Sequence, residues 1–197
     1  INSNASVSNN VFQNNNNYPQ FSTSAGINIG GGAPYILNNI FQNNFFGAYI
    51  SGGNKTTMEN NIFNNNTNKA IYVLGVSGIG SFKNNSGVLL GGASDGIYIS
   101  DLRILANATT TLYSNSLPYV FQNNSSVPVK AVLIVKPNIL IKNTDSNRIE
   151  VYGSLITEGV SPNDIVFTSL YDTTESYWFG ISANPGSRVS LTGTTIK

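Results

Sequence analysis

The sequence predicts an all-β protein built as a solenoid of parallel strands, and three observations support this. Near-copies of one short segment return along the chain, as NNVFQNN at 9–15, NNIFQNN at 38–44 and NNIFNNN at 60–66. The segments between them alternate polar and apolar residues with a period of two, which is typical of strands, and none has a helical period. Repeats of about 20 to 30 residues are typical of solenoids. Strands that repeat without helices predict a coil of strands.

Two sets of equivalent positions mark the repeat. We assign weaker copies of the recurring segment at SFKNNS (81–86) and YVFQNNS (119–125), so that its phenylalanines are 29, 22, 19 and 39 residues apart. Between them lies a second set of strands, whose equivalent positions Ile29, Ile50, Val73 and Ile99 are 21, 23 and 26 residues apart. This spacing predicts about 8 or 9 coils, or roughly 40 Å of solenoid at about 4.8 Å per coil.

The asparagines around each apolar pair predict a structural ladder. The chain has 31 Asn, concentrated before about residue 85. We expect the apolar pair to face inward and the asparagines to lie at the corners, where Asn tolerates a left-handed backbone and bonds to its own copies above and below. Such a ladder satisfies backbone groups that a tight turn would leave unpaired. The predicted ladder residues are Asn10, Phe12, Asn39, Phe41, Asn61, Phe63, Phe82 and Phe121.

The combination of GIYIS-type strands with NNIFQNN-type corners resembles the right-handed parallel β-helix repeat of the pectate-lyase-like superfamily. The resemblance covers roughly residues 1–105. It implies a single-stranded, right-handed parallel β-helix. Lyases, tailspikes and surface adhesins share this fold, so the resemblance sets the fold and leaves the activity open.

Near residue 105 the composition changes, and asparagine becomes less frequent. The segment 106–197 resembles a module of large microbial cell-surface β-helix proteins, and this resemblance implies an extracellular setting. The matching residues are Val151, Gly153, Leu155 and Gly159, then Ile165, Phe167, Thr168 and Ser169, then Trp178, Gly180 and Ile181, with Phe179 as a departure. We therefore predict two segments, 1–105 and 106–197, with the second stacked on the first, and we expect the chain to be a module of a longer protein.

Composition argues against several classes of chemistry. Charged residues make up 10% of the chain and the net charge is +1, so no basic surplus is available to neutralise a phosphate backbone. The chain has no His and no Cys, which removes thiolate sites and His-based catalysis. The densest charged group is Asp95, Asp101 and Arg103, which we expect at the two ends of a strand. We predict no catalytic residue, no metal site, no cofactor, no nucleic-acid partner and no membrane span in this segment.

Outward-facing tyrosines are candidates for a contact surface. Tyr49, Tyr72 and Tyr98 occupy equivalent places in the second set of strands. If the flanking isoleucines face inward, the three tyrosines form an outward row. Such a row can stack on the sugar rings of a polysaccharide, or it can pack against a neighbouring loop, module or subunit. Both readings stay open at this point.

Seven N-x-S/T sequons are present, which makes N-glycosylation possible if the protein is exported. With 31 Asn and 38 Ser plus Thr in 197 residues, chance alone predicts roughly six, so their number is no evidence in itself. The acceptor asparagines are Asn4, Asn54, Asn65, Asn84, Asn107, Asn123 and Asn124.

We expect a non-catalytic extracellular protein, a structural or adhesive β-helical module of a surface fibre, layer or filament. Neither 1–10 nor 188–197 has the helical period of a cap, so we expect the open strand edges to bind further β-helix modules or a second copy, head to tail. The alternative is a polysaccharide-binding or polysaccharide-degrading module on the same scaffold. A pair of carboxylates within about 10 Å in a groove would favour the alternative.

Overall fold

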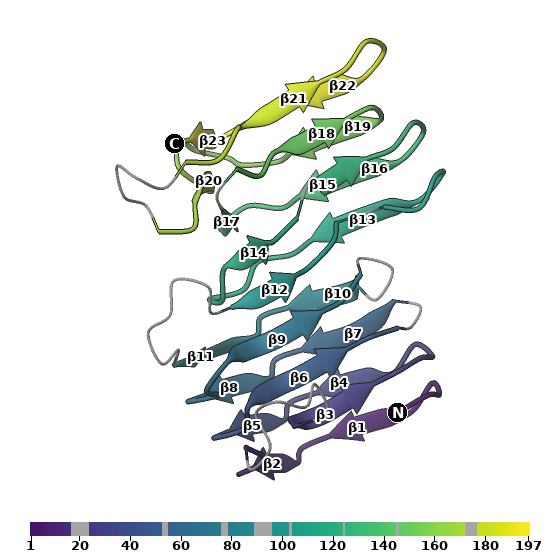
Figure 1. The fold of residues 1–197 in the computed structure, drawn as a ribbon, viewed down its shortest axis with the longest axis vertical. Helices are drawn as coiled ribbons and strands as arrows, with labels where there is room; N and C mark the ends of the chain where they lie inside the picture. The colour runs from purple at the N-terminus through teal and green to yellow at the C-terminus, as the bar shows by residue number, and fades with distance from the viewer. Residues whose placement is uncertain are drawn as a thin grey trace.

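The computed structural model describes residues 1–16, 24–52, 55–75, 79–88, 96–102, 104–123, 125–144, 146–171 and 177–197. Within these residues the regular elements are β-strands, and the pairings between strands are parallel. The predicted fold class, an all-β parallel solenoid or β-helix, is confirmed. Figure 1 shows the coils stacked along the long axis, with the N-terminus near one end and the C-terminus toward the other. No helix in the described part of the chain is long and apolar enough to cross a membrane.

One sheet of eight strands, which we call the long sheet, runs through the whole molecule. Each passage of the chain adds one strand to it, beside the strand from the passage before. Its strands are β3 (Ala25–Ile29), β6 (Phe46–Ile50), β9 (Lys69–Val73), β12 (Ile97–Ile99), β14 (Tyr119–Phe121), β17 (Ile139–Asn143), β20 (Ile165–Ser169) and β23 (Thr194–Ile196).

A second side of the coil consists of two four-stranded sheets, one in each half of the chain. The first is β1 (Ser6–Ser8), β4 (Tyr35–Leu37), β7 (Thr56–Glu59) and β10 (Ile79–Lys83). The other is β13 (Thr109–Leu112), β16 (Val132–Val135), β19 (Ser154–Thr157) and β22 (Arg188–Ser190). Backbone bonds from Asn84 N–H to the Ser114 carbonyl and from Ser116 N–H to the Asn85 carbonyl join the two halves.

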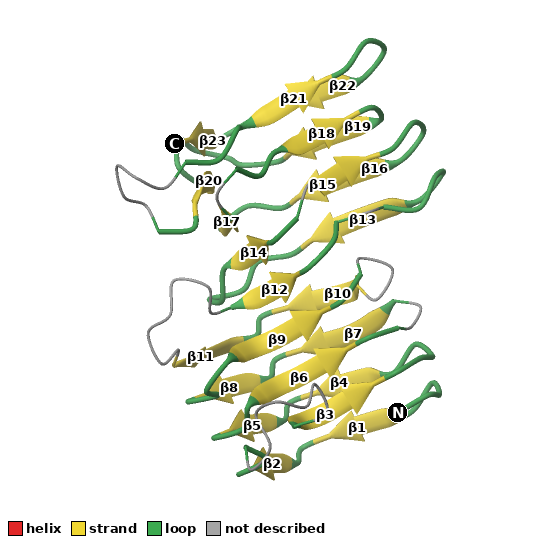
Figure 2. Ribbon diagram, viewed as in Figure 1, coloured by secondary structure: helices red, strands yellow, loops and turns green. Residues whose placement is uncertain are grey.

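The third side changes its place in the chain order between the halves. In the N-terminal half, residues 1–102, a sheet of β2 (Val11–Gln13), β5 (Ile40–Gln42), β8 (Ile62–Asn64) and β11 (Ser86–Val88) follows the second side and precedes the long sheet. We call it the corner sheet, and Figure 2 shows its strands stacked at the lower left. In the C-terminal half, residues 104–197, the third side is β15 (Ser125–Val127), β18 (Ile149–Val151) and β21 (Ile181–Ala183), which instead follows the long sheet.

This change corrects the expected number of coils. We expected about 8 or 9 coils of one repeating kind, and that number is too high. The chain passes the long sheet eight times, but among the described strands the longest run of coils built from the same three strands is four, because the corner sheet has four strands. The weaker repeats at 81–86 and 119–125 belong to other sides of the coil, so they are not further copies of the corner-sheet segment.

The core lies between the three sides and consists of the side chains that point inward from their strands. In the long sheet Ile29, Ile50, Val73 and Ile99 are in register and almost fully buried, as the sequence spacing predicts. Burying one such side chain stabilises the fold by about 1.5–3 kcal/mol, and the stack repeats this contribution at every coil.

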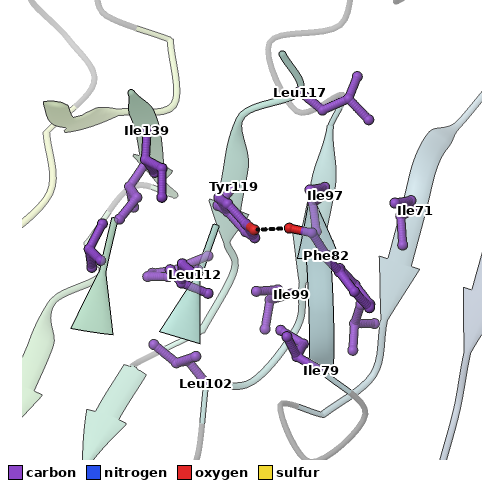
Figure 3. Close-up of a cluster of buried hydrophobic side chains, with 14 of the residues drawn as sticks. Ile71, Ile79, Phe82, Ile97, Ile99, Leu102, Leu112, Leu117, Tyr119 and Ile139 are labelled. Atoms are coloured by element: carbon purple, nitrogen blue, oxygen red, sulfur yellow. Dashed lines mark hydrogen bonds between the residues drawn. The ribbon is translucent and has the colours of Figure 1, made fainter. Parts of the chain in front are cut away.

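A buried tyrosine fills the core where the corner sheet ends. Gly87 is in register with Phe63, and a Cβ atom there would lie 1.7 Å from the Phe63 carbonyl oxygen, so no side chain continues that row. Tyr119, from the long sheet, is fully buried in the core of the next passage of the chain. Its hydroxyl donates to the Tyr113 carbonyl at 2.9 Å and to the Phe82 carbonyl at 3.3 Å, the latter drawn in Figure 3. Burial raises the pKa of this phenol.

Candidate functional site

The buried asparagines at the first corner form a continuous ladder between the second side and the corner sheet. The Asn39 backbone N–H and side-chain amide both donate to Asn61 Oδ1, at 2.9 and 3.1 Å. Asn61 donates in the same two ways to Asn85 Oδ1, and Asn85 to Asn115 Oδ1. Asn10 begins the ladder with the same pair of bonds to Asn39. Every rung thus satisfies a corner N–H and an amide of the coil before it.

From Asn39 onward, each ladder amide also donates to a backbone carbonyl of the preceding coil. Asn39 reaches the Val7 carbonyl, Asn61 the Ile36 carbonyl and Asn85 the Met58 carbonyl, at 2.8–2.9 Å. The side chains of Asn39, Asn61 and Asn85 are 0% exposed. Because a buried polar group without a partner is costly, complete pairing is what makes a core asparagine tolerable here.

A second ladder lies at the other corner of the same coils, and the sequence reasoning missed it. Asn15 donates twice to Asn44 Oδ1, and Asn44 donates twice to Asn66 Oδ1, at 3.0–3.1 Å. The second Asn pair of each NNxFxNN segment was the available signal. The segment therefore carries one Asn pair for each corner of the corner sheet.

The two residues of each Asn pair have different tasks. The first has a left-handed backbone, with φ of 56° at Asn38 and at Asn60 and 54° at Asn84. Its side chain points outward, whereas the second Asn of the pair is buried in the ladder. Asn adopts the left-handed region more readily than other residues with a Cβ, which explains why the dipeptide recurs.

Three phenylalanines stack inside the corner sheet, as predicted. The ring centroids of Phe12 and Phe41 are 5.0 Å apart and those of Phe41 and Phe63 are 4.9 Å apart, with interplanar angles of 8° and 9°. Phe82 and Phe121 do not belong to this row, which corrects their assignment. Phe82 is on the second side, in register with Met58, and Phe121 is in the long sheet, in register with Ile99.

The physical reason for these two errors is the position of the Phe relative to the Asn pair. In the corner sheet the Phe follows the Asn pair by two residues, as at Asn39 and Phe41. In SFKNNS the Phe precedes the pair, which is the place of Met58 on the second side. Both places are buried, so a short copy of the motif does not distinguish them.

The three tyrosines form an outward row on the long sheet, in the predicted register. Tyr49, Tyr72 and Tyr98 are direct neighbours in adjacent strands. The ring centroids of Tyr49 and Tyr72 are 5.4 Å apart with planes 1° apart, and those of Tyr72 and Tyr98 are 5.5 Å apart with planes 18° apart. Parallel rings at this separation are stacked on one another. Their faces are therefore largely covered by their neighbours, and their edges remain for other contacts.

An open hollow of about 350 Å³ lies beside this row. It is lined by the three tyrosines together with Phe46, Asn68, Lys69 and Gln122. The Lys69 Nζ lies 4.9 Å from the centre of the Tyr98 ring, within the range of a cation–π contact. The hollow thus combines aromatic edges, amides and one cation, which can offer hydrogen bonds and apolar contact together.

The C-terminal end of the tyrosine row packs against the protein itself. Tyr98 is 8% exposed and forms a small buried cluster with Val120 and Leu170, against which Tyr72 also packs. Leu170 comes from the segment after β20, which therefore covers this end. Burial, followed by the neighbouring Tyr72 and Tyr171 phenols, raises the pKa of Tyr98. The described residues thus show packing at one end of the row and an open hollow beside it.

Of the charged group predicted from the sequence, the structure describes Asp101, which is half-buried, and Asp95 and Arg103 lie outside the described residues. Among the described residues there is no group of three His, Cys, Asp or Glu side chains that could hold a metal ion. A second hollow of about 330 Å³ contains Asp164, but both carboxylate oxygens of Asp164 accept bonds from its own turn, from Val160 N–H and the Ser161 hydroxyl.

The described sequon asparagines lie on the surface. They are Asn4, Asn65, Asn84, Asn107 and Asn123, and each is exposed. Asn54 and Asn124 lie outside the described residues. Asn65 and Asn84 are also left-handed corner residues of the Asn pairs, with φ of 53° and 54°. A glycan on either would project from a corner of the coil.

A comparison of the chain with family models, with curated proteins and with solved structures found no match.

Proposed function

We propose that this chain is a non-catalytic structural or adhesive module of an extracellular fibre, surface layer or filament. The observation that supports it best is the pair of buried asparagine ladders. In each ladder the Asn of one coil donates to the side-chain oxygen of the Asn of the next coil, and the same bonds repeat from coil to coil. Such an arrangement extends along one axis by repetition. The buried polar groups of the chain therefore hold the coils together along this axis and make the solenoid rigid.

End-to-end extension is part of this proposal. β3 and β23 are the outermost strands of the long sheet, and each has one neighbour among the described strands. A further coil, either covalently continuous or from another copy, would pair with these edges through backbone bonds. The resemblance to right-handed β-helix repeats of the pectate-lyase-like superfamily, and to microbial surface proteins, is consistent with this use.

The test is the physical form of the intact, naturally processed protein. We expect electron microscopy to show extended rods or arrays with a repeat of about 4.8 Å along the axis in their diffraction. A compact monomer of about the mass of this chain, unchanged at high concentration, would contradict the proposal.

A second candidate function is the binding of a polysaccharide at the tyrosine hollow. The open volume beside Tyr49, Lys69 and Gln122 favours it, because edges and amides can bond to sugar hydroxyls. The stacked rings do not favour it, because few ring faces are free to pack on a sugar. Affinity electrophoresis through gels that contain neutral or acidic polysaccharides tests it. Retardation that Tyr49→Ala abolishes supports binding, and release of reducing ends would instead indicate an enzyme.

A further inference from the structure

The outer face of the corner sheet is a regular and uncharged surface. Two rows of side chains point outward from β2, β5, β8 and β11, in register from strand to strand. One row is mainly β-branched and the other mainly amide. We call them together the amide face, which consists of Val11, Ile40, Ile62 and Ser86 in one row and Gln13, Gln42, Asn64 and Val88 in the other.

Apolar side chains on this face are open to solvent. Val11 is 55% exposed, Ile62 40% and Val88 64%. The amides are already ordered, since Gln42 Nε2 donates to Gln13 Oε1 at 2.7 Å and Val88 N–H donates to Asn64 Oδ1 at 3.1 Å. The face is therefore rigid before any partner arrives, which lowers the entropy lost on binding.

No ionisable residue lies on the amide face or its corners, in 9–15, 38–44, 60–66 and 84–88. The other long faces of the described coils do carry charge. Glu59 and Lys83 point outward on the second side, and Lys69 and Lys142 do so on the long sheet. A neutral face of this kind does not repel an identical one.

We propose that the amide face is a lateral contact for a second copy of this chain, mated face to face. β-Branched and Gln/Asn rows stacked in register are the surface from which dry contacts between paired sheets are made. Amides donate and accept alike, so the face is complementary to itself in an isologous pair. The aromatic rings of the corner sheet point inward, so the face lacks the platform that a sugar would need. This contact is lateral, and it stands independently of end-to-end extension.

The size of the face sets the expected strength. Four strands at about 4.8 Å, each three residues long at about 3.3 Å per residue, give roughly 200 Å² per partner. That is about a quarter of the 800 Å² typical of a stable complex, so a single pair is weak. Modules displayed side by side in an array would add many such contacts.

Sedimentation equilibrium over about 10 μM to 1 mM tests the proposal. We expect concentration-dependent dimers of the wild-type chain.

Ile62→Lys should raise the dissociation constant of the dimer by about tenfold or more, because it places a like charge on both partners. The matched control is Ile134→Lys, on the outer face of β16, where a half-buried isoleucine is likewise centred on a parallel sheet. The control should leave the dimers unchanged. A wild-type chain that is monomeric at 1 mM, or equal effects of the two variants, would overturn the proposal.

A cross-linking experiment separates lateral from end-to-end contact. The natural chain has no Cys, so Ile40→Cys and Ile134→Cys each place one thiol on a known face. Mild oxidation should give disulfide dimers of Ile40→Cys faster than of Ile134→Cys, whereas end-to-end pairing alone would give equal rates and contradict a lateral contact. Circular dichroism checks that each variant folds. If Ile62→Lys does not fold, Gln42→Lys places the charge at an exposed tip of the same face.

Discussion

The two halves of the molecule form the same kind of coil with different residues at the corners and in the core. In the N-terminal half the corners are Asn pairs, and two asparagine ladders and a phenylalanine stack run between them. Beyond Asn115, where the first ladder ends, the described corners of the C-terminal half use single left-handed residues such as Asn138, Asn163 and Gly186, and the core is mainly aliphatic. The difference shows that a β-helix needs satisfied corners, and that stacked side chains or turn residues can each supply them.

The long sheet explains why the two halves can be joined. It continues through both, with β12 paired to β9 on one side and to β14 on the other. Only the third side changes its place in the chain. The junction is therefore a change of corner rather than a break, and Tyr119 and Gly87 are the residues that accommodate it.

The largest difference between the halves should appear on removing one ladder amide. Asn61→Ala would leave the Asn39 N–H buried without its partner, and it would remove one hydrogen bond each from the Asn39 amide and the Ile36 carbonyl. Since an orphaned buried group costs about 1–3 kcal/mol and each lost hydrogen bond about 1 kcal/mol, we expect a loss of roughly 3–5 kcal/mol in the free energy of unfolding, measured with urea.

The matched control in the other half is Asn163→Ala. Asn163 is exposed, with a left-handed φ of 69°. Its replacement should cost only about 1–2 kcal/mol, from the strain of a left-handed alanine and the loss of one exposed hydrogen bond from the Thr195 hydroxyl. If both variants lose the same amount, the ladder is not what stabilises the N-terminal half.

Close packing around the phenylalanine stack should give the next largest effect. A Cβ atom at Gly47 would lie 2.5 Å from the Phe63 ring and 2.5 Å from the Ala70 carbonyl oxygen. We expect Gly47→Ala to destabilise the fold by about 1–3 kcal/mol, with part of this recovered in the double variant with Phe63→Leu. At Gly75 nothing lies within 4 Å of a Cβ atom, so Gly75→Ala is the control and should be close to neutral.

The contribution of Tyr119, at the junction of the two halves, to the stability of the fold should depend on pH above pH 10. Because the folded-state pKa of Tyr119 is raised above the ordinary value of 10.0, the unfolded chain loses this proton first as the pH rises. Its contribution to stability is therefore complete below pH 10 and declines above it, by up to about 1.4 kcal/mol per pH unit. Tyr119→Phe should make the melting temperature fall less steeply above pH 10. It should lower the melting temperature at pH 7 through three lost hydrogen bonds, since the hydroxyl also accepts from the Asn115 amide. An unchanged slope would show that the phenol is not protected by burial.

The smallest effect belongs to the ion pair on the corner of the C-terminal half. Lys136 Nζ lies 2.6 Å from Glu158 Oε2, but the side chains are 37% and 42% exposed. Solvent and salt screen such a pair, so Lys136→Met should change the free energy of unfolding by less than about 1 kcal/mol. A larger change that disappears in 1 M salt would mean that this half depends on charge.

The features of the fold that depend on the period of the strands could be predicted from the sequence. The alternation of Ile and Tyr in the GIYIS-type strands set both the inward row and the outward tyrosine row in the observed register. It was not sufficient for the phenylalanines. Phe82 and Phe63 are equally buried, but Phe82 lies on the second side, before the Asn corner, and Phe63 lies in the corner sheet, after it. The move of the third side depends on where loops return, and no local pattern at 104–123 encodes that.

The tyrosine row shows a further limit. Its position was predictable, but the direction in which the rings face was not, because stacking along the axis and lying flat on the sheet satisfy the same alternation. The 5.4 Å separation of the Tyr49 and Tyr72 rings settles their stacking, and Leu170, from far along the chain, covers one end.

Hydrogen exchange in Asn61→Ala compared with the wild-type chain tests most directly whether the ladder is what stabilises the N-terminal half. We predict that the variant loses protection at the backbone amides of Asn39 and Asn61 and in β4, β5, β7 and β8. The amides of β16, β17 and β19 should keep wild-type exchange rates, because their corners do not use the ladder. Equal loss of protection in both halves, or none in either, would contradict the account.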